Sequence, residues 1–260
     1  MKIYCINLDR HPVRMERMRR CLHGLAFERI PAVDGKTLGG PDRRDVSRPV
    51  GADNITRYEL ACVRSHRVAW SRFLAKGEPY CCVLEDDVYL SPDFPKFVSD
   101  TSWIPSRCDL VKIETYCEKV MLSRHTIDAL DRVLTELRSL HQGTGAYILS
   151  RRGAEMLLAE TVRPGLPLDL VIFDTDILQR HGPLLQLIPA LCVQDRHIPG
   201  GIVFEEMQSS IQPKPIKLPK PLLKRIRLEV CRPFQQLHTA AGHIVFQLRA
   251  KARRMVVPYA

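Results

Sequence analysis

Strand-like and helix-like segments alternate along the first 160 residues, and this alternation is the strongest constraint on the fold. The expected strands are residues 2–8, 27–33, 80–84, 110–113 and 145–149, and the expected helices are residues 12–21, 56–73 and 151–158. Such an order is typical of an α/β fold, in which helices cover a mostly parallel sheet. We therefore expect an α/β domain with a mostly parallel sheet flanked by helices.

Two of the helix starts carry specific signals. Pro12 fits the first position of a helix, where its missing N–H is not needed. Thr56 and Glu59 have the spacing of a capping box, in which the Thr56 hydroxyl accepts from the Glu59 N–H and the Glu59 side chain reaches back. We expect a helix to begin at each of these places.

The excess positive charge lies at the C-terminal end of the chain. The 260 residues have a formal net charge of +10, and residues 211–260 hold eleven Lys and Arg against the single acid Glu229. Residues 1–210 are therefore neutral in sum. Several prolines from Pro213 to Pro221 predict a stiff, extended linker. We expect one folded domain at residues 1–210, followed at 211–260 by a basic Pro-rich linker and an amphipathic helical tail.

The cysteine pattern favours a reducing compartment. The nine cysteines are odd in number, include no Cys-x-x-Cys pair and mostly lie among apolar residues. Reduced, buried thiols are therefore expected. The first residues, MKIYCINLDR, contain only a short apolar run before Asp9, which fits neither a secretory signal nor a membrane span. We expect a cytoplasmic or peripheral protein.

Three consecutive acids, Glu85, Asp86 and Asp87, follow the expected strand 80–84 directly. In α/β sheets, ligands bind beyond the carboxyl ends of the strands, so these carboxylates should face a binding crevice. Neighbouring carboxylates repel one another unless a cation lies between them, and Mg²⁺ and Mn²⁺ prefer oxygen ligands. The acidic triplet therefore indicates a divalent metal site, with an exposed acidic turn as the alternative.

Six sequence blocks occur in an order that resembles a known family. They are IYCINLDRHPVRMERM near the start, PAVDG at 31–35, RYELACVRSHRVAW at 57–70, CVLEDDVYL at 82–90, GTGAYILSRRGAEMLL at 143–158 and PLDLVIFD at 167–174. Together they resemble glycosyltransferase family 25, which includes bacterial lipooligosaccharide galactosyltransferases and procollagen galactosyltransferases. The resemblance spans about residues 1–195, so residues 1–210 are expected to be the catalytic domain.

The resemblance implies an inverting, metal-dependent sugar transferase with the nucleotide-diphosphosugar-binding fold called GT-A. The acidic triplet then corresponds to the Asp-x-Asp-like motif of the family. Asp87 is expected to bind Mn²⁺ or Mg²⁺, and Glu85 or Asp86 to reach the ribose or a water on the metal, with Glu85 as a further metal ligand. The donor is expected to be a UDP-sugar, and family members commonly use UDP-galactose.

The resemblance also assigns donor-binding roles to residues outside the triplet. Asn7, Asp9, Arg10 and Arg14 stand where the first strand meets its helix and are expected to contact the nucleotide, with helix capping by these residues as the alternative. Asp34 is expected to accept a hydrogen bond from uracil or ribose, or else to form an Asx turn.

Three further residues join the expected donor site. Arg64 and His66 are expected to offer polar groups to the diphosphate, and His66 is chosen through its Ser-His match to the family. Gly145 is expected to let the backbone approach the sugar or the acceptor, with a tight turn into a strand as the alternative.

Inversion requires a general base for the acceptor hydroxyl. Asp169 is the first candidate, because it lies among apolar residues and matches the Pro-x-Asp of the family. Asp174 and Asp176 are reserves, and a helix cap is the alternative role for Asp169. His197 is expected to complete the metal site, as late histidines do in some related transferases.

The basic tail suggests a membrane partner. Apolar residues recur at helical spacing from Phe234 to Leu248 and again at Met255, beside a cluster of bases. We expect an interfacial helix on anionic lipid, with a helix packed on the body as the alternative. Nucleic acid is not expected as a partner, because the tail has few aromatic residues and no recognised nucleic-acid motif.

The sequence therefore predicts transfer of a hexose, with galactose favoured, from a UDP-sugar to a lipooligosaccharide or lipopolysaccharide core glycan at the cytoplasmic face of the inner membrane. Two rival functions are a protein hydroxylysine galactosyltransferase and a catalytically silent module that binds nucleotide sugar or lipid. The oligomeric state is left open.

Overall fold

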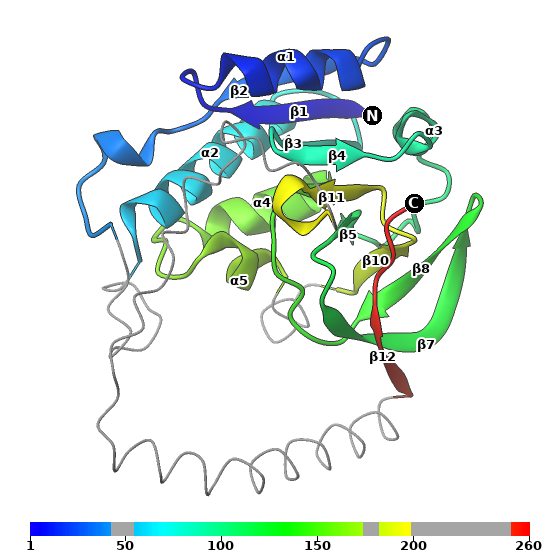
Figure 1. Ribbon diagram of the computed structural model, residues 1–260. Coiled ribbons are helices and arrows are strands. Elements are labelled where there is room, and N and C mark those ends of the chain that lie inside the picture. The colour runs from blue at the N-terminus through cyan, green and yellow to red at the C-terminus, as the bar shows by residue number, and fades with distance from the viewer. Residues whose placement is uncertain (43–54, 174–181, 199–250) are drawn as a thin grey trace, which may run out of the picture.

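One large sheet organises the molecule (Figure 1). The computed structural model describes residues 1–42, 55–173, 182–198 and 251–260. In sheet order the strands are β12 (Ala252–Val256), β7 (Lys119–Ala129), β8 (Arg132–Leu137), β10 (Leu184–Ile188), β5 (Leu110–Lys112), β9 (Ala146–Ser150), β3 (Tyr80–Glu85), β1 (Lys2–Asn7) and β2 (Phe27–Pro31). The α/β class and the five strands expected from the sequence are confirmed.

The expectation of a mostly parallel sheet is wrong, because the sheet is mixed. β1 runs parallel to β2 and β3, and β10 runs parallel to β5. The remaining pairs, including β9 with both β3 and β5, are antiparallel. The β7–β8 hairpin was missed because its turn holds Leu130 at φ 58°, where a sequence signal normally needs Gly or Asn.

Helices cover both faces of the sheet. The helix α1 (Pro12–Cys21) and the short α3 (Phe94–Ser99) pack on one face, while α2 (Arg57–Leu74), α4 (Arg151–Glu160) and α5 (Leu168–Ile172) pack on the other. Successive strand residues enter different cores: Cys81 and Val83 join the α2 side, and Cys82 and Leu84 join the α1 side. A strand buried on both faces reads as a continuous apolar run, which is why this segment carried a strong strand signal.

The two specific helix starts are confirmed. Pro12 opens α1 within its first turn. Thr56 caps α2, with the Thr56 hydroxyl accepting from the Glu59 N–H at 3.1 Å and the Thr56 N–H donating to Glu59 at 2.9 Å. The start of α2 fixes the wall that faces the ends of β1 and β3.

A second, three-stranded sheet lies beyond the carboxyl end of β3. It has the order β4 (Val88–Leu90), β11 (Cys192–Gln194), β6 (Glu114–Thr115), and the short η3 (Asp195–His197) follows β11. The Asp195 N–H donates to the Asp87 carbonyl at 2.9 Å. This small sheet therefore fixes the position of the acidic triplet from the side opposite α2.

The end of the chain belongs to the body, which corrects part of the expected helical tail. β12 pairs with β7, so Met255 lies in a strand and not in the expected helical series. Val257 is fully buried in the core, and its carbonyl accepts from the Thr115 hydroxyl at 2.7 Å. The expected linker and the apolar series from Phe234 to Leu248 lie outside the described residues.

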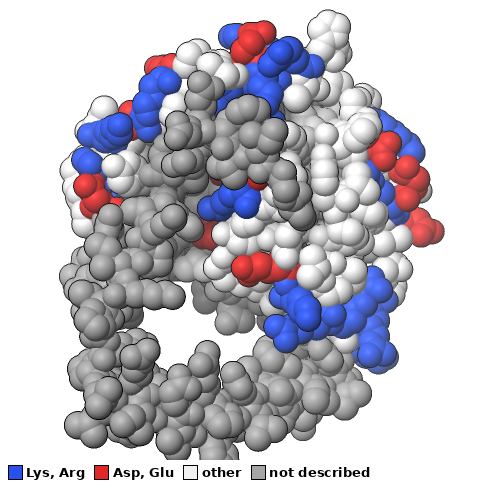
Figure 2. Space-filling view, in the orientation of Figure 1, with Lys and Arg blue, Asp and Glu red and all other residues white. Residues whose placement is uncertain are grey.

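Positive charge nevertheless remains on this edge of the molecule. Arg253 and Arg254 of β12 are exposed, and Figure 2 shows Lys and Arg side chains gathered where β12 lies. Within the described residues, no helix combines the length and apolar character needed to cross a membrane.

Replacing Val257 by Asp should lower the free energy of unfolding by about 3 kcal/mol or more, because the change buries a carboxylate in an apolar core. The matched control is Val256→Asp, the same change at a neighbour that is 40% exposed, where a loss within about 1 kcal/mol is expected. Urea unfolding measures both values. Equal, small losses would contradict the placement of residues 251–260 in the core.

Candidate active site

A pocket of about 640 Å³, its open mouth included, lies at the carboxyl ends of β1 and β3 against the wall formed by α2. Its apolar side chains are Ile6, Leu8, Ala32, Val33, Tyr58 and Ala61, and its polar or ionisable ones are Arg10, Arg14, Cys62, Ser65, His66, Glu85, Asp86 and Asp87. The structure thus brings six of the sequence-predicted site residues into one pocket.

Asp86 is held by donors from the first strand and helix. Asn7 Nδ2 donates to Asp86 Oδ2 at 2.6 Å, and Arg14 donates to Asp86 Oδ1 at 3.0 Å. Arg17 donates to the Asp86 carbonyl at 2.9 Å, and Arg29 donates to Asn7 Oδ1 at 2.9 Å. The Asp86 carboxylate is therefore held by Asn7 and Arg14, and Glu85 and Asp87 have other partners.

Glu85 is oriented from three sides. The Thr144 hydroxyl donates to Glu85 Oε1 at 2.5 Å, His66 Nε2 lies 3.4 Å from the same oxygen, and Gln194 Nε2 lies 3.4 Å from Glu85 Oε2. Burial raises the pKa of Glu85, but the contact with His66 and the Thr144 hydrogen bond outweigh it and lower this pKa overall. The Glu85 carboxylate is therefore ionised, and its partners fix the orientation of the side chain.

Asp87 has fewer partners than Glu85. Its Oδ1 lies 3.5 Å from Gln194 Nε2, the amide that also reaches Glu85. Burial, followed by the charges of Glu85 and Asp86, raises the pKa of Asp87 to about 7. The charges of Arg14 and Arg196 lower this pKa but do not offset the other effects, so a bound cation would stabilise the Asp87 carboxylate.

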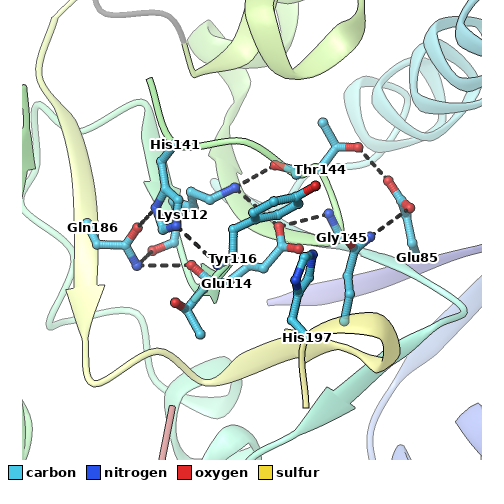
Figure 3. A network of polar contacts seen from close by, with 12 residues as sticks. Glu85, Lys112, Glu114, Tyr116, His141, Thr144, Gly145, Gln186 and His197 are labelled. Carbon is cyan, nitrogen blue, oxygen red and sulfur yellow. Dashed lines mark hydrogen bonds and ion pairs between the residues drawn. The ribbon is translucent and has the colours of Figure 1, made fainter. Parts of the chain in front are cut away.

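A buried ion pair supports the segment that orients Glu85 (Figure 3). Lys112 and Glu114 are both fully buried, 3.2 Å apart. Lys112 donates to the Gly143 carbonyl, and Glu114 accepts from the Gly145 N–H at 3.0 Å. Burial lowers the pKa of Lys112 and raises that of Glu114, and the attraction between them opposes both shifts. The pair fixes the backbone on either side of Thr144.

The same network contains a histidine whose protonation state is set by geometry. His141 Nε2 accepts from the Tyr116 N–H at 3.1 Å, so Nδ1 carries the proton and donates to Gln186 Oε1 at 2.8 Å. Gln186 Nε2 in turn donates to the carbonyls of Lys112 and Glu114. Burial, followed by the charge of Lys112, lowers the pKa of His141 to about 3.

Other predicted donor residues lie at the rim or away from the pocket. Asp34 pairs with Arg10 and also accepts from the Lys36 N–H at 2.9 Å, so the expected Asx turn is present. Asp9 is exposed and pairs with Arg29. Arg64 is exposed and lines a separate surface hollow with Arg67 and Arg72 among others, so the structure does not bring it together with His66.

The predicted base and the third predicted metal ligand do not line this pocket. Asp169 lies in the first turn of α5, where the cap position is Pro167, and its charge acts on Lys112 and on Tyr116. The ring of His197 lies 3.9 Å from that of Tyr116. Burial and the charge of Arg196 lower the pKa of His197 to about 4, which leaves the ring neutral. Asp174 and Asp176 lie outside the described residues.

Sequence reasoning missed the supporting residues Lys112, Glu114, Thr144 and Gln194. One signal was present: Lys112 and Glu114 are oppositely charged residues two positions apart in an otherwise apolar segment, Lys112 at the end of β5 and Glu114 at the start of β6. Two opposite charges at such positions indicate a buried pair. No comparable signal marks Thr144 or Gln194, because their contacts join segments distant in the sequence.

Because His141 is neutral in the folded protein, the free energy of unfolding should fall as the pH is lowered. Its pKa of about 3 in the folded state is below the ordinary 6.5, so its contribution is fully present above about pH 6.5 and is lost as the pH falls toward 3. The loss should reach about 1.4 kcal/mol per pH unit. Urea unfolding from pH 7 to 4 measures it. His141→Gln should weaken the dependence of the free energy of unfolding on pH, and the exposed control His125→Gln should leave it unchanged. An unchanged slope in His141→Gln would contradict the low pKa of His141.

Comparison with known proteins relates these residues to a family. The model of glycosyltransferase family 25, described as an LPS biosynthesis protein family, matches residues 1–172. The lacto-N-neotetraose biosynthesis glycosyltransferase LgtB of Neisseria meningitidis serogroup B is 39% identical over 154 residues, which are 55% of this chain and 56% of that protein. The lipooligosaccharide biosynthesis protein lex-1 of Haemophilus influenzae is 29% identical over 154 residues, 54% of this chain and 50% of that protein.

The chain thus spans about half the length of the curated relatives it matches. Among solved structures, a glycosyltransferase involved in glycosylation of the major capsid of PBCV-1 aligns with a TM-score of 0.42 and 11% identity, over 74% of this chain and 91% of that one. The family match covers the acidic triplet, the α2 wall, the buried ion pair and Asp169, and it confirms the resemblance noted in the sequence. The chain belongs to glycosyltransferase family 25.

Proposed function

We propose that this protein transfers a hexose, with galactose favoured, from a UDP-sugar to a lipooligosaccharide or lipopolysaccharide core glycan. The observation that carries the proposal is the pair of carboxylates, Glu85 and Asp87, at the carboxyl end of β3 in a pocket with an apolar half. The names of LgtB and lex-1, which refer to lacto-N-neotetraose and lipooligosaccharide biosynthesis, support the class of acceptor.

The pocket suits the two chemically different ends of a nucleotide-diphosphosugar. Ile6, Ala32 and Val33 offer apolar surface to a nucleoside base. Arg10 and Arg14 line the same pocket and offer positive charge to a diphosphate. A position at the ends of β1 and β3, where α/β sheets bind ligands, agrees with a GT-A-like arrangement, which we adopt as part of the proposal.

The donor set fits a hard divalent cation. Glu85 Oε2 and Asp87 Oδ1 converge on one point, because both lie within 3.5 Å of the same amide nitrogen of Gln194. Carboxylate oxygens are the ligands that Mg²⁺ and Mn²⁺ prefer. The pKa of Asp87 is raised first by burial and then by the charges of Glu85 and Asp86, so a bound cation would stabilise this carboxylate. Asp87 and Glu85 would hold the ion. His197 is kept as a proposed third ligand that would have to move, because its ring nitrogens do not form a group within 4.8 Å with these two carboxylates, and Nε2 accepts from Arg196 Nε at 3.0 Å. A bound Mn²⁺ or Mg²⁺ would neutralise charge on the leaving diphosphate.

The remaining chemistry falls to side chains of the chain itself. In the proposed inverting reaction, Asp169 takes the proton from the acceptor hydroxyl as that oxygen attacks the anomeric carbon opposite the leaving group. Thr144 and His66 hold Glu85 in direction, Asn7 donates a hydrogen bond to Asp86, and Arg14 offsets part of the Asp86 charge. We further propose that the basic segment of residues 211–250 holds the protein to anionic lipid at the cytoplasmic face of the inner membrane.

A panel of nucleotide sugars tests the proposal. Full-length protein is heated with UDP-galactose, UDP-glucose, GDP-mannose or CMP-sialic acid, each with and without Mn²⁺. A UDP-sugar at about 100 times its Kd should stabilise the fold by about 2.7 kcal/mol, and only with the metal. Equal stabilisation by all four donors, or by none, would reject a UDP-sugar site.

Asp87→Asn should abolish metal-dependent turnover while keeping the fold. The amide has the size of the carboxylate but no charge, so repulsion within the triplet falls and the cation loses a ligand. A loss of about 100-fold or more in kcat is expected from mutations that remove a charge-stabilising group. Release of UDP with Mn²⁺ measures it, with the exposed Asp131→Asn as the control. Full turnover in Asp87→Asn at saturating Mn²⁺ would remove Asp87 from the metal site.

Asp169→Asn should separate chemistry from binding. An amide cannot accept the proton of the acceptor, so transfer should fall by about 10²- to 10⁴-fold. Stabilisation by UDP-sugar and Mn²⁺ should stay close to that of the unchanged protein, because Asp169 is not a residue of the donor pocket. If the thermal stability and the donor binding fall together, Asp169 has a structural role and another group is the base.

A further inference from the structure

The same pocket also holds a sulfur, a nitrogen and an oxygen that could bind one metal ion, whereas the proposed Mn²⁺ site uses carboxylate oxygens. Cys62 Sγ, a ring nitrogen of His66 and a carboxylate oxygen of Glu85 all lie within 4.8 Å of one another. Cys62 and His66 are four residues apart on α2, so they share one face of the helix, and Glu85 ends β3 opposite them. Within the described residues, no other three side chains of His, Cys, Asp or Glu bring their ligand atoms close enough together to share one ion.

Each of the three side chains is fixed by a second contact. His66 Nδ1 lies 2.7 Å from the Tyr147 hydroxyl, which also accepts from Trp70 Nε1 at 2.8 Å. This contact leaves His66 Nε2 as the nitrogen that points to Glu85 Oε1, at 3.4 Å. Thr144 donates to Glu85 Oε1 and lies 4.0 Å from Cys62 Sγ. Such outer contacts are what orient the ligands in metal sites.

The group can be reached and has an open side. All three residues line the pocket, and Cys62 is partly exposed. His66 is 1% exposed, and its Nε2 makes no hydrogen bond. Glu85 Oε1 lies 3.4 Å from this buried nitrogen, so a cation bound between the ring, the thiol and the carboxylate would satisfy all three groups.

We propose that Cys62 Sγ, His66 Nε2 and Glu85 Oε1 form a binding site for a soft divalent cation of the Zn²⁺ class. Thiolate and imidazole select Zn²⁺ over Mg²⁺ and Mn²⁺, and three protein ligands with one open position are a common arrangement for this ion. On binding, the Cys62 thiol loses its proton to solvent, and His66 keeps its one ring proton on Nδ1, facing the Tyr147 hydroxyl, so that Nε2 offers a lone pair to the ion. The thiolate and the Glu85 carboxylate balance the charge of the ion.

Glu85 belongs to both this site and the proposed Mn²⁺ site, so the two ions compete. A Zn²⁺ ion bound by Cys62 and His66 withdraws Glu85 from Asp87 and occupies the pocket that the UDP-sugar needs. The protein is therefore inhibited by Zn²⁺ through its donor pocket. The binding of Zn²⁺ stands on the geometry alone, whereas this inhibition rests on the proposed function.

Cobalt reports the site directly, because Co²⁺ replaces Zn²⁺ and shows a thiolate-to-metal charge-transfer band. Reduced, full-length protein titrated with Co²⁺ should show this band with about one ion per chain, and Zn²⁺ should remove it while excess Mg²⁺ should not. Cys62→Ser should lose the band, and His66→Gln should weaken Co²⁺ binding by about tenfold or more. The exposed thiols Cys21 and Cys117 provide matched controls, so Cys21→Ser and Cys117→Ser should keep the band.

A second measurement uses the protein without substitutions, so its result does not depend on whether a variant folds. Zn²⁺ should slow the alkylation of Cys62 by iodoacetamide, followed by peptide mass spectrometry, and should leave the rate at Cys21 unchanged. A missing Co²⁺ band, a band that persists in Cys62→Ser, or alkylation of Cys62 that is insensitive to Zn²⁺ would each overturn the site.

Loss of UDP-sugar stabilisation on adding Zn²⁺ tests the competition separately. If no nucleotide sugar stabilises the protein in any condition, the proposed function fails while the Co²⁺ result still decides the metal site. If Zn²⁺ binds Cys62 but leaves UDP-sugar stabilisation intact, the shared use of Glu85 is wrong.

Discussion

The buried ion pair of Lys112 and Glu114 is the interaction on which the candidate site depends. Both side chains are fully buried, and two charges removed from water are stable only when paired and hydrogen-bonded. Loss of one partner from such a pair costs about 3–5 kcal/mol. Lys112 also donates to the Gly143 carbonyl, and Glu114 also accepts from the Gly145 N–H. These hydrogen bonds join β5 and β6 to the segment that enters β9. The position of the Thr144 hydroxyl, and through it of Glu85, follows from this pair.

The glycines beside Thr144 are part of the same constraint. Gly143 has φ +88°, which favours glycine, and a Cβ on Gly145 would lie 2.9 Å from Glu114 Oε1. The backbone therefore packs directly on the Glu114 carboxylate. The sequence suggested that Gly145 lets the backbone approach a sugar; in the structure, the close approach is to Glu114.

The structure also explains how three adjacent acids can share one strand end. Asp86 turns toward the first strand and helix and is held by Asn7 and Arg14. Glu85 turns toward α2 and the Thr144 segment, and Asp87 stays beside it with a raised pKa. All three acids line the pocket, and the charges of Glu85 and Asp86 both raise the pKa of Asp87. Because Asp86 is held by Asn7 and Arg14, Glu85 and Asp87 are the two carboxylates that can share an ion.

Local patterns predicted the elements of this protein well and predicted their arrangement less well. The buried strands, the capping box at Thr56 and the acidic triplet carry their information within a few residues. The direction of β9 is not recorded in a few residues, because an antiparallel strand between β3 and β5 has the same apolar pattern as a parallel strand. The family resemblance supplied Asp169 and His66, while Thr144 and Gln194 act through contacts across 59 and 109 residues of sequence, which no local pattern records.

The position of β12 changes how the basic segment must be understood. The expected tail was a free appendage, but residues 251–260 pair with β7, bury Val257 and bring the Ala260 carbonyl to Arg132 at 2.8 Å. The chain on both sides of residues 199–250 therefore belongs to the body. A basic segment held at both ends would act on an anionic surface together with Arg253 and Arg254, and not as an independent anchor.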